Sequence, residues 1–482
     1  MNNENKQLDI IPKHTSEALS PETLRLSELW RNEPWARIQS NMPYGIPEDD
    51  TIGERQRLGA RTAFLSGDSS EPELTYPRLD MVDLGSAIVR FDEMITKLKL
   101  RPEENPLLFE SVSDKIAELS RHRYVLEAVQ ATTDEERNKY LNYAEQLAVE
   151  VFGDVEPARF NTLLADLTET ASSTDTQYSR ELLDLLPGVD PNLEKVVQET
   201  LKPETIAKLE PLIRQYLAPM FEIVDALPDG EFEHERSIEV FQSCIDALGL
   251  DGVRAILTMG NALDADGFTM TIGLGRNRAK LTRETFLTVG IHELIHIIGS
   301  YEGQKQEDDV ISIGLPKSLS FEEGKCVAVE QIVTGKATKR GEPYYFALGL
   351  LKGTIDGMPR TFRQVHEILW RKTILSKKGE ITDDMVAGAK KSAYQTCMRI
   401  TRGHAADTRD LAYYNGNDIA SGWFNQIAEL PNDQALATVE ATLSTKADPT
   451  NPVHLEHLEQ HHPKWQQFTT MGASEAKTLL KI

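Results

Sequence analysis

The residues with the clearest chemical potential lie at 291–296, where Ile-His-Glu-Leu-Ile-His carries the pattern HExxH. His292 and His296 are four residues apart, so in a helix their imidazoles lie one above the other and can bind one metal ion. Glu293 points beside that face, where a carboxylate can act as a general base on water without being a ligand. The pattern therefore predicts a Zn²⁺ site with a catalytic base.

The residues around this motif predict a buried helix. Its apolar members are Phe286, Leu287, Val289, Ile291, Leu294, Ile295, Ile297 and Ile298. Two histidines and a glutamate are costly inside such a helix unless they are hydrogen-bonded or bind a metal. The alternative to a metal site is a hydrogen-bonded pair of core histidines on a structural helix.

A third metal ligand is expected, because a catalytic zinc ion usually takes three protein ligands and keeps a fourth position for water. The candidate segment is Ser-Phe-Glu-Glu-Gly at residues 320–324. Glu322 and Glu323 are adjacent and cannot both face the ion. We favour Glu323, since the glutamate directly before glycine is the ligand in many glutamate-type zinc peptidases. The alternative is a pair of solvated carboxylates at a helix N-terminus.

The order of four segments resembles the tyrosine carboxypeptidase-like family, which is related to the microtubule-associated enzymes that remove a terminal tyrosine. Its bacterial members carry a QEGLA motif. The family has an HE-containing helix, an xEG helix, an Arg-x-x-Arg-Gly segment, and an Asp followed by aromatic residues and Gly. The matching segments are His292-Glu293, Phe321–Gly324, Arg399–Gly403 and Asp410–Gly416. A weaker likeness of helical segments extends upstream to Tyr76.

Two features depart from the family pattern. The family typically spaces its histidines as HExxxH, whereas Ile297 occupies that position here. Lys325 and Cys326 follow the glycine in place of Leu-Ala. These departures mark a divergent member whose substrate can differ. Cys326 could sit near the metal, but an inert buried thiol is the preferred interpretation.

The resemblance implies a carboxypeptidase, which must recognise a free α-carboxylate beside the metal. Arg399 and Arg402 match the two arginines of the family and are the candidate carboxylate binders, because a planar guanidinium can bind both oxygens. Tyr413 or Tyr414 would stabilise the oxyanion or line the pocket for a terminal side chain. For each of these residues the alternative is a structural salt bridge or a packed ring.

These residues predict a zinc-dependent metallocarboxypeptidase that hydrolyses the C-terminal peptide bond of peptides or proteins, with Tyr or Phe as the released residue suggested by the family. Two alternatives remain. An endopeptidase of the gluzincin type would share every zinc residue but needs an open cleft. A scaffold or regulatory protein with a structural zinc site would be no enzyme, and a fourth metal position closed by a side chain would favour it.

The elements that must position these residues are mostly helical. Apolar residues recur at helical spacing from Leu108 to Leu119 and from Tyr140 to Val151. We call the expected helix that carries His292 and His296 the metal helix. Before it, residues 264–267 read as a turn and residues 268–274 as a short strand. An edge strand there could hold a substrate backbone. Thr282 is the expected N-cap of a helix that runs to Gly299.

The predicted fold class is therefore α+β and predominantly α-helical, with a gluzincin-like zinc peptidase core, a small sheet and an N-terminal helical region. We expect an N-terminal extension with loops at residues 1–80, a helical region at 81–220 and the zinc metallopeptidase catalytic domain at 221–482.

Composition restricts the partners of this 482-residue chain, which has 52 Lys and Arg against 76 Asp and Glu and a net charge of −24. That charge argues against binding to nucleic acid or to an anionic membrane. A peptide or protein C-terminus remains as the expected partner, and it should be neutral or basic near its end. Three separate cysteines form no disulfide framework, and the N-terminus lacks a secretory signal. We therefore expect a cytoplasmic location.

Overall fold

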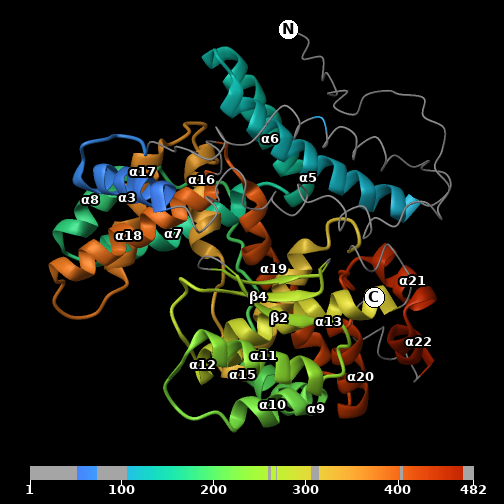
Figure 1. Ribbon diagram of the computed structural model, residues 1–482. Helices are drawn as coiled ribbons and strands as arrows, with labels where there is room; N and C mark the ends of the chain where they lie inside the picture. Colours follow the sequence, from blue (N-terminus) through green and yellow to red (C-terminus); the bar gives the residue numbers. More distant parts are fainter. Residues whose placement is uncertain are drawn as a thin grey trace, which may run out of the picture.

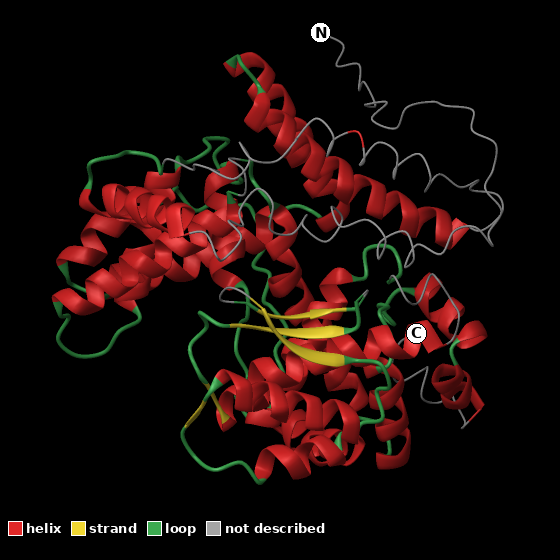
Figure 2. Cartoon of the chain, in the orientation of Figure 1, coloured by secondary structure: helices red, strands yellow, loops and turns green. Residues whose placement is uncertain are grey.

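The computed structural model describes residues 51–72, 89, 106–258, 262–267, 269–305, 314–401 and 405–470 (Figure 1). The fold is predominantly helical with a small sheet, as predicted (Figure 2). Arg402 and the predicted N-terminal extension up to residue 50 lie outside the described residues. Within the described part, no helix has the length and hydrophobicity needed to cross a bilayer.

The sheet lies next to the metal helix and has three strands in the order β2-β4-β3. Strand β2 (Arg254–Thr258) is parallel to β4 (Thr271–Gly275), and β3 (Leu263–Asp266) is antiparallel to β4. A separate antiparallel pair joins β1 (Glu231–Phe232) to β5 (Leu281–Thr282).

One prediction about this region was wrong, and another was confirmed only in part. Residues 264–266, predicted as a turn, belong to β3, because pairing with β4 outweighs the turn preference of their two aspartates. The strand predicted at 268–274 corresponds to β4, which is paired on both sides and so is no edge strand. The edge beside the metal helix belongs to β3.

Most of the described helices gather around two large hydrophobic cores, and a smaller cluster lies between α5 (Pro106–Gln130) and α6 (Asp134–Phe152). The first core contains the sheet together with α9 (Pro203–Tyr216), α10 (Ala218–Asp225), α11 (His234–Ala247), α13 (Ile291–Lys305), α15 (Leu319–Thr334), α20 (Asn432–Leu443), α21 (Pro452–His461) and α22 (Pro463–Thr470). The second contains α3 (Thr51–Ser66), α7 (Pro157–Ser173), α8 (Gln177–Leu185), α16 (Glu342–Lys352), α17 (Phe362–Leu375) and α18 (Asp383–Ile400). Helix α19 (Leu411–Ile427) contributes to both cores. The long helices α5 and α6 pack against each other (Figure 1).

The two cores do not follow the domain boundary predicted at residue 220. Helices α9 and α10 precede that boundary but pack with the metal helix. Helices α16, α17 and α18 follow it but pack with α7 and α8. Local periodicity indicates that a segment is helical, but it does not indicate which helices share a core.

The metal helix begins as predicted at Thr282, whose side chain accepts a hydrogen bond from the Thr285 backbone in a capping box. One helical turn at Arg283–Thr285 (α12) leads into a π-helical turn at Phe286–Gly290, and α13 follows. Such π-turns are frequent at functional sites. Helix α13 continues beyond the predicted end and stops at Lys305.

Helices α15 and α19 cross in direct backbone contact, and two glycines make this possible. A Cβ added to Gly324 would lie 2.0 Å from the carbonyl oxygen of Gly416. A Cβ added to Gly416 would lie 1.8 Å from the carbonyl oxygen of Ser320. The crossing holds Glu323 on α15 next to the first turns of α19, where further predicted site residues lie.

Replacing Gly324 by Ala should therefore destabilise the protein. The new methyl group would push the two helices apart, and overpacking of this kind costs about 1–3 kcal/mol in the free energy of unfolding. Gly388 in α18 has open space at its Cβ position, so Gly388→Ala should be stabilising by about 0.5–1 kcal/mol. Urea unfolding of both variants checks this, and a Gly324→Ala protein as stable as the wild type would contradict the close contact.

Candidate metal centre

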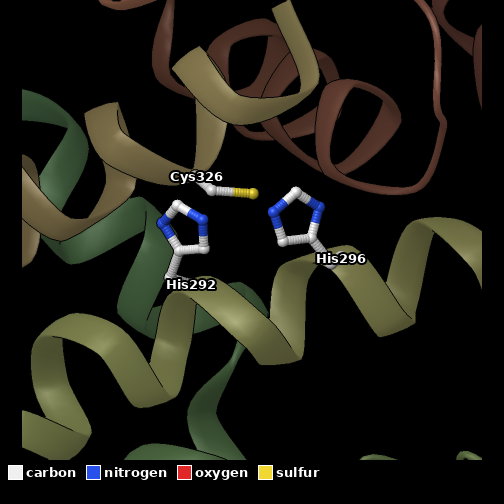
Figure 3. A group of neighbouring side chains, drawn as sticks. All are labelled: His292, His296 and Cys326. Carbon is white, nitrogen blue, oxygen red and sulfur yellow. The ribbon is translucent and has the colours of Figure 1, made fainter. Parts of the chain in front are cut away.

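Helices α13 and α15 pack against each other and bring His292, His296 and Cys326 together. Their donor atoms all lie within 4.8 Å of one another. Figure 3 shows the Cys326 sulfur between the two imidazole rings. Because nitrogen and sulfur donors of this kind bind transition metals, the group could hold a metal ion.

Glu323 adds an oxygen donor on the same side of the two imidazoles. Its Oε2 atom lies 3.3 Å from Nε2 of His292 and 3.7 Å from Nε2 of His296. Ligand atoms bound tetrahedrally to one zinc ion are separated by roughly 3.3 Å, as metal–ligand bonds of about 2.0–2.1 Å require. The two distances from Glu323 are therefore close to the spacing of ligand atoms on one ion. In the described part of the chain, histidines are the only cationic groups within ion-pair distance of Glu323.

The other nitrogen of each imidazole is held by a different carboxylate. Nδ1 of His292 is 2.6 Å from Oε1 of Glu330, and Nδ1 of His296 is 3.0 Å from Oε1 of Glu322. Carboxylates in this position orient metal-binding imidazoles and make them better ligands. Glu322 also lies 3.3 Å from Nζ of Lys446. Glu323 thus faces Nε2 of both histidines, whereas the adjacent Glu322 faces Nδ1 of His296.

The electrostatics of the site favour positive charge between the two helices. Burial works against protonated imidazoles, but Cys326, Glu323 and Glu330 outweigh it and raise the pKa of His292 to about 10. The pKa of His296 is likewise raised well above its usual value. Burial also opposes ionisation of Glu323, yet the two histidines hold its pKa well below the ordinary range. A divalent cation at this position would supply the positive charge that the carboxylates attract.

Glu293 is anchored by the sheet. Its Oε2 atom accepts a hydrogen bond of 2.9 Å from the backbone N–H of Ala265 in β3. Burial raises the pKa of Glu293 to about 7. A carboxylate with this pKa can accept and return a proton near neutral pH, as a general base must.

A cavity of about 100 Å³ lies beside Glu323, with room for about three water molecules or a small polar group. Its lining residues are Leu319, Glu323, Arg399, Arg409, Asp410, Ala412 and Tyr413. The cavity therefore connects a candidate metal ligand with two guanidinium groups and a phenol.

Arg399 is fixed on one side of the cavity. Its Nε and one terminal nitrogen each lie 2.9 Å from an oxygen of Asp410. Its guanidinium also lies over the rings of Tyr344 and Tyr413, with 4.8 Å and 5.2 Å to the ring centroids. Although burial opposes the charged form, Asp410 keeps the pKa of Arg399 above its ordinary value.

The two adjacent tyrosines point to different places. Tyr413 lines the cavity, and the charge of Glu323, followed by burial, raises its pKa. Tyr414 instead lies in the second core, 4.5 Å from the ring of Tyr345 and 1% exposed. Successive helical residues point about 100° apart, so only Tyr413 is brought to the cavity.

Sequence reasoning missed Glu330, Arg409 and Lys446. A signal for Glu330 was present, because Glu323, Cys326 and Glu330 are spaced by three and four residues and so share one face of α15. Arg409 and Lys446 have no such signal, since only tertiary packing brings them near the motif. Arg402 lies outside the described residues, and its role stays a prediction.

Comparison with known proteins adds no assignment: no protein-family model, curated protein or solved structure matches the chain. The resemblance to the tyrosine carboxypeptidase-like family and the gluzincin-like core thus remain expectations.

Metal binding can be tested on the residues that the geometry brings together. We expect the wild-type protein to bind one zinc ion, and His296→Ala or Glu323→Gln to lose most of it. Glu330→Gln should weaken zinc binding about 10- to 100-fold, because it removes the partner that orients His292. His461→Ala, an exposed histidine on α21, serves as the control and should retain the metal. Zinc content after dialysis measures each variant, and equal content in all of them would argue against this site.

Proposed function

We propose that the protein is a zinc-dependent metallocarboxypeptidase that hydrolyses the C-terminal peptide bond of peptides or proteins. One arrangement carries the proposal: Glu323 faces Nε2 of His292 and of His296 and also lines the cavity that holds Arg399 and Arg409. A metal site next to a cavity lined by two guanidinium groups suits a substrate whose reacting bond lies beside a carboxylate.

In this proposal His292, His296 and Glu323 hold the zinc ion, a nitrogen and oxygen donor set typical of catalytic zinc. A zinc ion held there would supply Lewis-acid chemistry to the scissile carbonyl and would lower the pKa of water. Glu293 takes a proton from the attacking water and delivers it to the leaving amine. Glu293 is placed for both transfers by its hydrogen bond from the Ala265 backbone N–H.

The cavity residues bind and orient the substrate. Arg399 and Arg409 bind the α-carboxylate, and Asp410 keeps Arg399 in place through its two short contacts. Tyr413 is protonated at neutral pH, and the charge of Glu323 raises its pKa further, so its hydroxyl can donate a hydrogen bond to the carbonyl oxygen as negative charge develops there. By resemblance, Arg402 is a further carboxylate binder, and a terminal Tyr or Phe is the preferred residue.

A non-catalytic structural metal site is the second candidate, because one observation favours it. The Cys326 sulfur lies within 4.8 Å of donor atoms on both histidines, and structural zinc sites have all four positions filled by protein.

Glu293→Gln tests the catalytic part of the proposal. Loss of the general base should lower kcat by about 10²- to 10⁴-fold, while zinc content stays unchanged. Glu302→Gln, on the same helix α13, is the matched control and should retain activity. Mass spectrometry of a peptide mixture before and after incubation gives the readout. A Glu293→Gln protein as active as the wild type would refute the assigned role.

The exopeptidase assignment is tested with free and amidated C-termini. We expect removal of one residue from free-acid peptides and none from the amidated forms. Arg409→Ala should lower kcat/KM for free-acid peptides about 10- to 100-fold, because a charge-assisted hydrogen bond is lost. Arg214→Ala, which removes the pair with Asp225 on α9 and α10, is the control. Equal cleavage of amidated peptides, or cleavage at internal bonds, would instead identify an endopeptidase.

A further inference from the structure

The Cys326 sulfur lies within 4.8 Å of donor atoms on His292 and His296, the same two imidazoles that Glu323 approaches. Cys326 lies three residues after Glu323 on α15, so both side chains project from one face of that helix. His292 and His296 project from one face of α13. Two packed helices therefore present two donors each, and the Cys326 sulfur lies between the imidazole rings (Figure 3).

The surroundings of Cys326 differ from those of the other two cysteines. All three are free and buried. Burial raises the pKa of Cys244 to about 12 and raises that of Cys397 as well, which keeps both as neutral thiols in apolar surroundings. Cys326 instead lies within 4.8 Å of donor atoms on two histidines. A thiolate is also a strong zinc ligand. A metal bound by these histidines would therefore displace the thiol proton and bind the Cys326 sulfur.

We infer that Cys326 is a fourth protein ligand, and that His292, His296, Glu323 and Cys326 form a closed tetrahedral set in the resting protein. Catalytic zinc sites keep one position open for water, whereas this set leaves none. The Cys326 sulfur must then dissociate from the metal before water can bind there. The resting centre is therefore latent, meaning inactive until this metal–sulfur bond opens. The latency rests on the proposed hydrolase function, but the ligation by sulfur does not.

The ligation is tested by replacing the metal with cobalt(II). The wild-type protein should show a thiolate-to-cobalt charge-transfer band in the near ultraviolet. Cys326→Ala should still bind cobalt through the three remaining ligands but lose this band. Cys244→Ala and Cys397→Ala are the matched controls and should keep it. A wild-type protein without the band, or a band that persists in Cys326→Ala, would overturn the inference.

A second measurement needs no variant. X-ray absorption of the zinc-loaded wild-type protein should show one sulfur neighbour at about 2.3 Å together with nitrogen and oxygen neighbours at about 2.0–2.2 Å. A coordination shell of nitrogen and oxygen alone would exclude Cys326 as a ligand, even if Cys326→Ala fails to fold.

The latency is tested separately by hydrolysis. Cys326→Ala should cleave free-acid peptides several-fold faster than the wild type, because water can enter without displacing sulfur. A rate equal to or below that of an active wild type, with the sulfur bond present in the spectra, would overturn the latency. If neither protein cleaves any peptide, the proposed hydrolase function and the latency that rests on it fail together, while the spectra still decide the ligation.

Discussion

Between α13 and α15, two imidazoles and three carboxylates share a volume that solvent barely reaches, and their charges must be compensated there. Burial alone would make each of these groups costly. The histidines offset the carboxylates through direct contacts of 2.6 Å and 3.0 Å, and the nearby Lys446 and Arg340 add positive charge at the edge. Glu323 remains at the centre with histidines alone as its cationic neighbours among the described residues. Glu322 and Glu330 thus each have a cationic partner besides a histidine, whereas Glu323 has the histidines alone in the described part of the chain. This difference is the physical reason to expect a bound cation beside Glu323.

The rest of the fold holds this cluster in place. Strand β3 fixes Glu293 through a single backbone hydrogen bond. The contact between Gly324 and Gly416 sets α19 against α15, which brings Tyr413 and the cavity next to Glu323. Helix α19 also joins the two hydrophobic cores. Strand β3 and the crossing of α15 with α19 therefore position Glu293 and Tyr413, which are far apart in the chain.

The part of the site that depends on local spacing could be predicted from the sequence. His292, Glu293 and His296 lie on a helix with the expected Thr282 cap, since these features are encoded within about four turns of one helical segment. The choice between Tyr413 and Tyr414, and the nearness of Cys326, depend on how helices pack, so periodicity left them open. Strand β3 was missed because its aspartates favour turns in isolation, and the two cores cut across the predicted boundary because distant helices pack together.

We propose that one metal ion lies between α13 and α15, bound by His292, His296 and Glu323. Anomalous diffraction at the zinc absorption edge, from crystals of the zinc-loaded protein, tests it most directly. We expect one strong peak within about 2.0–2.2 Å of Nε2 of both histidines and of a Glu323 carboxylate oxygen. An anomalous map with no peak between these three side chains, or with its zinc elsewhere, would contradict it.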